Sequence, residues 1–137
     1  MRNLTTALLT KFNELTYEGV HNSFWISVNG ILRKERAEQK DVPPYAVYHI
    51  ISDVPSFTFS SEFETVRIQF DLYSLKESSS EIEDMYTNLK SLFDWCELTI
   101  SGNTHLYMRR ELARLSKDPT DDCWTYSVDY MIMMEKL

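Results

Sequence analysis

The side chains of this sequence that could do chemistry begin with three histidines and two cysteines. His21, His49 and His105 lie far apart, and none has a partner at the spacing of a metal site such as HExxH. Cys96 and Cys123 form no CxxC pair, which disfavours a zinc site. A nucleophilic cysteine needs a base beside it. Cys123 could meet His105 across a hairpin, but no neighbouring residue marks either side chain as activated.

These residues fit structural roles better than reactive ones. A free cysteine behaves as a small hydrophobic side chain, so we expect both thiols to be reduced and buried, with a disulfide as the alternative. His49 falls in a predicted strand, on the same face as Tyr45, Val47 and Ile51. We therefore expect it to be a hydrogen-bonded histidine in the core or at an interface.

An acidic turn at Asp118, Asp121 and Asp122 could hold a divalent cation. Aspartates in turns usually accept hydrogen bonds from the local backbone, so we expect a structural turn. The three glycines are not spaced as a GxGxxG phosphate loop. We therefore predict no catalytic residue, no cofactor and no metal, and a protein that is not an enzyme.

The densest basic patch within a predicted strand is Arg109, Arg110 and Arg114. Strict alternation places Arg110 and Arg114 on one face and Arg109 on the other. Protection of a sheet edge or cross-strand pairing explains them best, with a salt bridge between subunits or a DNA contact as alternatives. The formal net charge of −7 opposes a general grip on nucleic acid.

Length and composition indicate one domain spanning residues 1–137, with enough hydrophobic content (43%) for a core without disulfides or metals. No run of about 18 apolar residues predicts a membrane span. The first residues carry one basic side chain and no sustained apolar segment, so we expect no secretion signal and a chain that stays in the cytosol where it is made.

Two helices are predicted. Residues 4–15 place Leu4, Leu8, Phe12 and Leu15 on one face. Residues 80–93 repeat apolar side chains at helical spacing and begin with a capping box between Ser80 and Glu83.

Strands are predicted at about residues 24–28, 45–52, 64–73, 97–100, 104–115 and 122–134. The strand at 45–52 is apolar on both faces, whereas 64–73 and 122–134 alternate with period 2. The order of elements predicts an α+β fold, with a largely antiparallel sheet packed with two helices.

Two connections stand out. Residues 33–41 are the most charged run, which fits either a solvated loop or turn, or a docking loop. Residues 53–63, with Phe57 and Phe59, fit either a strand extension or a wide hairpin loop. The two aromatic side chains fit core or interface filler better than base stacking, because no basic residue lies near them before Arg67.

The segment Pro44-Tyr45-Ala46-Val47-Tyr48, then an alternating strand ending in Asp71-Leu72-Tyr73, then a helix, resembles the tail terminator and tail completion proteins of long-tailed bacteriophages. The resemblance is one of pattern and order, and it extends over roughly residues 4–134. Two features depart from the family: residues 33–41 are densely charged where members are often rich in glycine and alanine, and the last strand is unusually aromatic.

The resemblance implies a virion structural protein of the neck, made in the host cytoplasm, that forms a homo-oligomeric, hexameric ring. The ring would cap the tail tube and join it to the head–tail connector, while DNA passes through without specific binding. Recognition is then assigned to loops at residues 33–41 and 53–63. The candidate interface residues are Arg33, Lys34, Arg36, Lys40, Phe57, Phe59, Arg109 and Arg110.

The rival hypothesis is a small cytosolic α+β ligand-binding domain or enzyme. Its pocket would be lined by Tyr48, Tyr73, Tyr126 and His49. The two hypotheses differ in where the aromatic side chains lie: on surfaces covered by other copies, or around one cavity.

Overall fold

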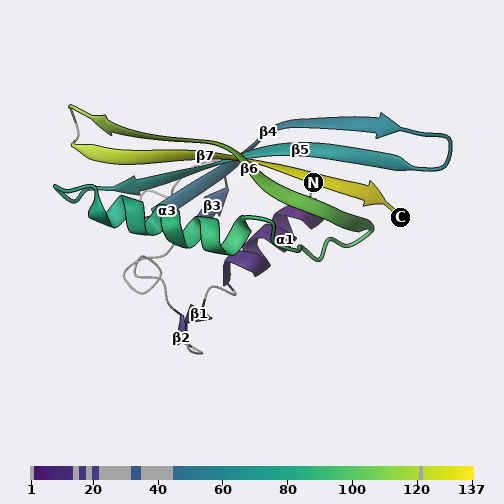
Figure 1. The fold of residues 1–137 in the computed structure, drawn as a ribbon, viewed down its shortest axis with the longest axis horizontal. Coiled ribbons are helices and arrows are strands. Elements are labelled where there is room, and N and C mark those ends of the chain that lie inside the picture. Colours follow the sequence, from purple (N-terminus) through teal and green to yellow (C-terminus); the bar gives the residue numbers. More distant parts are fainter. Residues whose placement is uncertain (1, 14–15, 18–19, 22–31, 35–44, 121) are drawn as a thin grey trace.

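The computed structural model describes residues 2–13, 16–17, 20–21, 32–34, 45–120 and 122–137. Figure 1 shows the arrangement of its elements along the chain. They are α1 (Arg2–Asn13), β1 (Thr16–Tyr17), β2 (Val20–His21), β3 (Leu32–Lys34), β4 (Tyr45–Phe57), β5 (Glu62–Ser74), α3 (Ser80–Phe93), β6 (Asn103–Asp118) and β7 (Cys123–Lys136).

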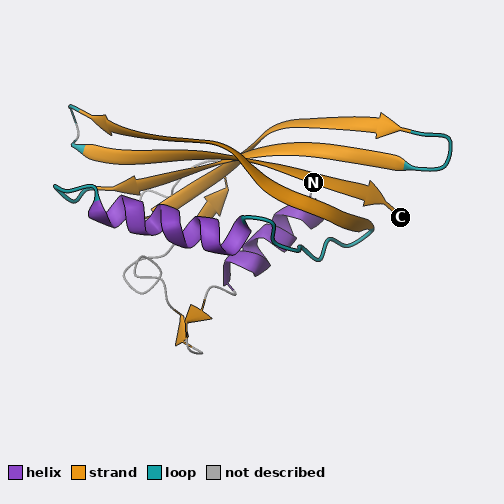
Figure 2. Ribbon diagram, in the orientation of Figure 1, coloured by secondary structure: helices purple, strands orange, loops and turns teal. Residues whose placement is uncertain are grey.

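The main sheet has the strand order β3-β4-β5-β7-β6. The β3–β4 pair is parallel, and the three other pairs are antiparallel. Both α1 and α3 lie on the same side of this sheet (Figure 2), and β1 and β2 form a separate short pair. The predicted α+β class, with a largely antiparallel sheet and two helices, is confirmed.

The core lies between the two helices and the sheet. The helices contribute apolar stripes at helical spacing, from Leu4 and Leu8 in α1 and from four residues of α3. The sheet contributes one residue in two, as the alternation of β5 and β7 predicts. The ring of Phe70 is at the centre, 4.9 Å from Phe93 and 5.8 Å from Tyr130 between centroids. The contributing residues of α3 are Ile82, Met85, Leu89 and Phe93.

Several predicted boundaries are wrong. Helix α1 begins at Arg2 rather than at residue 4 and is described to Asn13, so Leu15 lies outside the described residues. Helix α3 spans the predicted residues, but its N-cap is Ser79 and no capping box forms at Ser80. The Ser79 hydroxyl instead lies 3.3 Å from the carboxylate of Glu83. The predicted strand at 24–28 lies outside the described residues.

The predicted strand at 97–100 is also wrong, because this segment is an irregular connection between α3 and β6. Leu98 and Ile100 are buried in the core while their neighbours are exposed, which produces the alternation of a strand without a strand's hydrogen bonding. Trp95 precedes it with a φ of 55°, and its backbone N–H donates to the Met108 carbonyl, 2.8 Å away. This turn redirects the chain so that the segment covers the core instead of pairing.

The strands of the sheet are longer than predicted. β4 continues to Phe57, β6 spans Asn103–Asp118 and β7 spans Cys123–Lys136. Of the two alternatives for residues 53–63, the strand extension is the one found, with a turn closed by the Thr58 N–H donating to the Ser61 carbonyl. The segment to which recognition is assigned is therefore a strand hairpin, and its role in recognition stays a prediction. We call residues 53–63 the arm.

Candidate interaction surfaces at the two edges of the sheet

Among the described residues, the sheet ends in β6 on one side and in β3, with the unpaired length of β4 beyond it, on the other. The short strand β3 pairs only with residues 46–48 of β4, so the rest of β4 has no described neighbour on that side. β6 pairs with β7 alone. Outer strands present backbone N–H and C=O groups that can recruit another chain, and natural proteins cover or interrupt them.

The arm projects from the β4 side, beyond the helices (Figure 1). Its residues from 53 to 60 are exposed, in contrast to the buried residues 46–48 at the start of the same strand. Phe57 is 69% exposed and Phe59 is fully exposed. These two phenylalanine rings form an exposed apolar surface at the tip of an ordered hairpin, and no described residue packs over them.

The arm is also acidic. Asp53, Glu62 and Glu64 lie on it or at its base, and no lysine or arginine occurs between residues 45 and 66. Lys136 of β7 approaches Glu62 at 3.7 Å, which offsets part of this charge. Partial burial and then the negative charge of Asp53 raise the pKa of Glu64 above its usual value. Burial is therefore the main cause of the raised pKa of Glu64, and repulsion from Asp53 and Glu62 adds to it.

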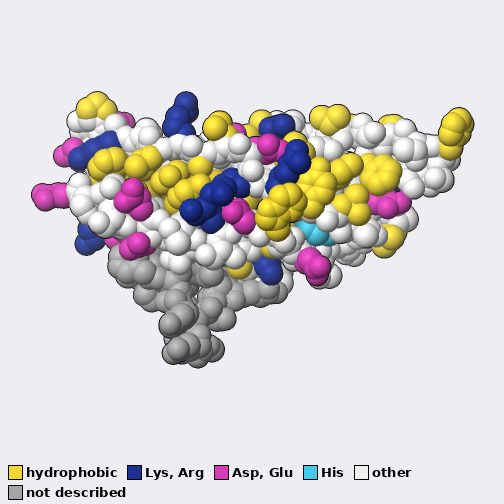
Figure 3. Space-filling model, in the orientation of Figure 1, with side chains coloured by type: hydrophobic (Ala, Val, Ile, Leu, Met, Phe, Trp, Pro, Cys, Tyr) yellow, Lys and Arg dark blue, Asp and Glu magenta, His cyan; other side chains and the backbone are white. Residues whose placement is uncertain are grey.

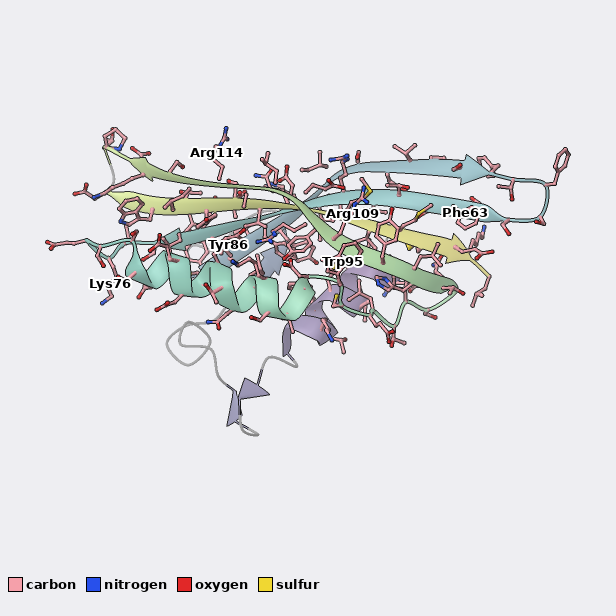
Figure 4. All side chains as sticks on the ribbon, viewed as in Figure 1. Phe63, Lys76, Tyr86, Trp95, Arg109 and Arg114 are labelled. Atoms are coloured by element: carbon pink, nitrogen blue, oxygen red, sulfur yellow. The ribbon has the colours of Figure 1, made fainter. Side chains whose placement is uncertain are left out.

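The opposite edge carries aromatic and basic side chains. Trp95 is 69% exposed, and its ring lies 6.2 Å from that of Tyr107. The guanidinium of Arg109 lies 5.4 Å from the Tyr107 ring, and its Nε donates to Glu111 at 2.9 Å. Leu106 and Leu112 are exposed beside them. We call Trp95, Leu106, Tyr107, Arg109 and Leu112 the edge patch. Figure 4 shows Trp95, in the turn after α3, next to the part of β6 that carries Arg109.

Two register shifts in β6 create this patch. They lie between His105 and Tyr107 and between Arg110 and Leu112, and each moves the following side chains to the other face. Arg109, Leu112 and Arg114 consequently share the face of the sheet that points away from the helices. The prediction that Arg110 and Arg114 share a face is wrong for this reason, since strict alternation contains no bulge.

Arg109 and Arg110 are neighbours with different roles. Arg110 points toward α3, where it hydrogen-bonds the Tyr86 hydroxyl and lies 3.4 Å from the Asp94 carboxylate. Asp94 also accepts a hydrogen bond of 2.6 Å from the buried Tyr130 hydroxyl. Burial and this hydrogen bond raise the pKa of Tyr130. Arg110 therefore ties α3 to the sheet, while Arg109 contacts Tyr107, Glu111 and Met131 within the β6–β7 hairpin.

The remaining candidate residues fall in the charged run at 33–41. Arg33 and Lys34 lie in β3, opposite Val47 and Tyr48, so the predicted loop begins with a strand. Arg36 and Lys40 lie outside the described residues. Trp95 and Leu112 were not predicted, because neither a helix-terminal turn nor a bulge has a distinctive pattern in this sequence.

The outer face of the sheet carries a polar cluster around Asp71. This carboxylate accepts hydrogen bonds of 2.8 Å from Ser127 and Gln69, and His49 Nε2 lies 3.3 Å from its other oxygen. Burial and the charge of Asp71 raise the pKa of Asp129, which lies opposite Gln69. The hydrogen-bonded role expected for His49 agrees with this geometry.

The rival pocket does not assemble. Tyr48 and Tyr126 are on the helix side of the sheet, where Tyr126 stacks on Tyr86 at 4.1 Å. Tyr73 and His49 are on the outer face, at register positions opposite Tyr45 and Gln69. Four residues divided between two faces of one sheet cannot line one cavity.

The candidate reactive groups are also separated. His105 pairs with Met134 and Cys123 with Asp118, at opposite ends of the β6–β7 hairpin, so they do not meet. The cysteines form no disulfide and are half-buried rather than buried. Asp118 accepts a 2.8 Å hydrogen bond from the Thr120 N–H, as expected for a structural turn, while Asp121 lies outside the described residues.

Two further searches cover only the described part of the chain. No group of three or more histidine, cysteine, aspartate or glutamate side chains is arranged there to hold a metal ion. Neither α1 nor α3 has the length and apolar character that crossing a membrane requires.

Scans of the sequence against protein-family models and curated proteins give no match. The fold is similar to that of a chain in the solved structure described as "Virion of native gene transfer agent (GTA) particle". The TM-score is 0.74, and the match covers 96% of this chain and 94% of that chain at 5% identity. At this identity the likeness shows a shared fold.

Proposed function

We propose that this chain is a virion structural protein of a tailed bacteriophage or a phage-like particle, and that it acts as a tail terminator. The observation that carries the proposal is the likeness of almost the whole chain to one chain of a gene transfer agent virion. That likeness supports a virion structural protein, and the finer role of tail terminator rests on the family pattern of the sequence, with its proline-tyrosine signature before the strand.

The proposed role is a ring of six identical subunits that caps the tail tube and joins it to the head–tail connector. A ring of identical subunits needs a heterologous contact, in which two different surfaces of the chain meet. The described residues offer two such surfaces, on opposite edges of one sheet. The exposed aromatic side chains of the arm and the edge patch would then be covered by neighbouring copies or partners.

The charge of the chain suits a channel through which DNA passes. A formal net charge of −7 disfavours adhesion to phosphate, so DNA would move through the ring without specific binding. In this proposal the protein is made in the host cytoplasm and is found in the mature virion, at the neck.

The test is an interrupted copy of the gene in the phage or prophage that carries it. Without a terminator, filled heads should accumulate apart from tails, and the tails should have irregular lengths in electron micrographs. Complementation with the intact gene should restore joined particles. Normal particles made without this chain would contradict the proposal.

A second measurement addresses assembly directly. Size-exclusion chromatography with light scattering should detect masses that grow with concentration from one chain of 16.2 kDa toward a ring. The tail-tube and connector proteins from the same gene cluster should bind the purified chain. A persistent monomer that binds neither protein and converts a small metabolite would favour the rival class.

A further inference from the structure

We infer that the arm of one copy docks on the edge patch of the next copy, and that this contact gives every copy the same orientation relative to its neighbour. The inference rests on the proposed function, because it names the surfaces through which the proposed ring would close. It commits to a second copy of this chain as the occupant of the edge patch.

The first argument is that the two surfaces complement one another. The arm combines exposed phenylalanines with Asp53, Glu62 and Glu64. The edge patch combines exposed leucines and Trp95 with Arg109, whose charge is partly offset by Glu111, and Arg114 follows on the same face. Apolar anchors surrounded by opposite charges are the arrangement found at specific interfaces.

Figure 3 shows the patch side of the molecule, where hydrophobic side chains form a band along the sheet and basic groups interrupt it. An exposed tryptophan in the left-handed region is uncommon, since a bulky side chain is disfavoured there. The neighbouring structure holds Trp95 in place through the backbone hydrogen bond to Met108 and the contact with Tyr107. A large aromatic side chain fixed at the surface is well suited to anchor a partner.

The second argument is geometric. In the strand order β4-β5-β7-β6 the two surfaces are three strand spacings apart, about 14 Å at about 4.8 Å per spacing. The arm extends away from the patch along an ordered hairpin, so the two surfaces of one molecule cannot meet. An arm can therefore contact an edge patch only on another molecule, and each molecule supplies one arm and one patch for such contacts.

The third argument concerns direction. Successive antiparallel pairs from β4 to β6 leave these two outer strands antiparallel to each other. When copies are placed side by side in the same orientation, the β6 strand of one meets the β4 strand of the next in the antiparallel sense. The bulges in β6 interrupt its open edge, so side chains of the arm carry the contact instead of a continuous strand ladder.

The central experiment uses two variants of the full chain. The arm variant is Phe57→Ser with Phe59→Ser, and the patch variant is Arg109→Glu with Leu112→Ser. Each should weaken self-association by about 30-fold, the effect of losing an interface hot spot of about 2 kcal/mol. Mixed in equal amounts, they should form a 1:1 heterodimer through their remaining intact surfaces and no larger species.

Charge reversal provides the rescue. Asp53→Lys with Glu62→Lys should weaken association, and so should Arg109→Glu with Arg114→Glu. In a mixture of these two reversed chains both contacts are available, because the lysine arm of one chain meets the glutamate patch of the other while the two unchanged surfaces also meet. The mixture should therefore assemble beyond heterodimers, whereas the mixture of the arm and patch variants should stop at heterodimers. The matched controls are Leu75→Ser and Lys76→Glu, which alter an exposed leucine and an exposed lysine before α3, at the far end of that helix from Trp95 (Figure 4). Both controls should associate like the unchanged chain.

A photo-crosslinking amino acid at position 59 detects the contact even when it is transient. Illumination of the concentrated chain should join position 59 to the edge patch of a second copy, as mapped by mass spectrometry. Crosslinks elsewhere, no crosslinks, or oligomers that neither variant weakens would overturn the inference. The particle phenotype of the interrupted gene tests the proposed function separately, so oligomers insensitive to both variants would refute only the docking.

Discussion

The two halves of the β4–β5 hairpin show how the same residue types serve opposite purposes. Phe70 is fully buried under α3, in contact with the rings of Phe93 and Tyr130. Phe57 and Phe59, on the same hairpin, are exposed beyond the helices. Both halves of the hairpin form regular strands. Whether an aromatic side chain stabilises the folded monomer therefore depends on whether a helix packs over it. The exposed half contributes little to folding and is available for binding.

The largest expected effect is in the covered half. Phe70→Ala should lower the free energy of unfolding by about 3–5 kcal/mol, because it removes a fully buried ring and leaves a cavity. Phe59→Ala should change it by less than about 0.5 kcal/mol, since the ring is exposed. Urea denaturation of the two variants measures the difference. Equal destabilisation by both substitutions would show that the arm is part of the core.

A buried polar contact gives the next largest effect. The hydroxyl of Ser74, at the end of β5, donates a 2.6 Å hydrogen bond to the carboxylate of Glu81 in α3, and both residues are buried. Ser74→Ala should cost about 1–3 kcal/mol, because the carboxylate loses its partner away from water. Thermal unfolding followed by circular dichroism is the measurement. Ser56→Ala on the exposed arm is the control, and an equal loss there would contradict the contrast between the halves.

Much of this architecture could be predicted from the sequence. The alternation of 64–73 and 122–134 gave the correct strands, and the apolar spacing of 80–93 gave the correct helix. The failures have physical causes: Leu98 and Ile100 alternate in burial without pairing, and two bulges in β6 reverse the faces of Leu112 and Arg114. Bulges depend on tertiary contacts, so a pattern of side chains along one strand does not reveal them.

The candidate interface shows the same limit. Phe57 and Phe59 were predicted as interface or core filler, and the exposed position of both leaves the interface hypothesis to be tested. Arg109 and Arg110 could not be told apart in sequence, because their separation depends on what lies above each face of β6. That difference can be measured.

Arg110→Ala should destabilise the fold by about 1 kcal/mol or more, since it removes the partner of Asp94 and the hydrogen bond to Tyr86. Arg109→Ala should leave the denaturation midpoint unchanged and should instead weaken self-association. Urea titration and light scattering on the same two samples separate the effects. The reverse result would exchange the roles assigned to these arginines.

The smallest expected effect is a dependence of stability on pH at Asp129, on the outer face of the sheet. Burial, followed by repulsion from Asp71, raises the pKa of Asp129 in the folded chain above the usual value of 3.8, against the attraction of Arg67, Arg114 and His49. Between 3.8 and the raised pKa, the folded state binds more protons than the unfolded state, so this group lowers stability as the pH increases.

The substitution Asp129→Asn removes the titrating carboxyl group and keeps the size of the side chain. The variant should be more stable than the unchanged chain at neutral pH, and the difference should shrink as the pH falls toward 3.8. Urea midpoints measured across this range provide the test, with Asp118→Asn in the exposed turn as the control. A variant less stable at neutral pH would mean that attraction from Arg67 and Arg114 outweighs burial, and that the outer face is held together by its charges as the core is by its rings.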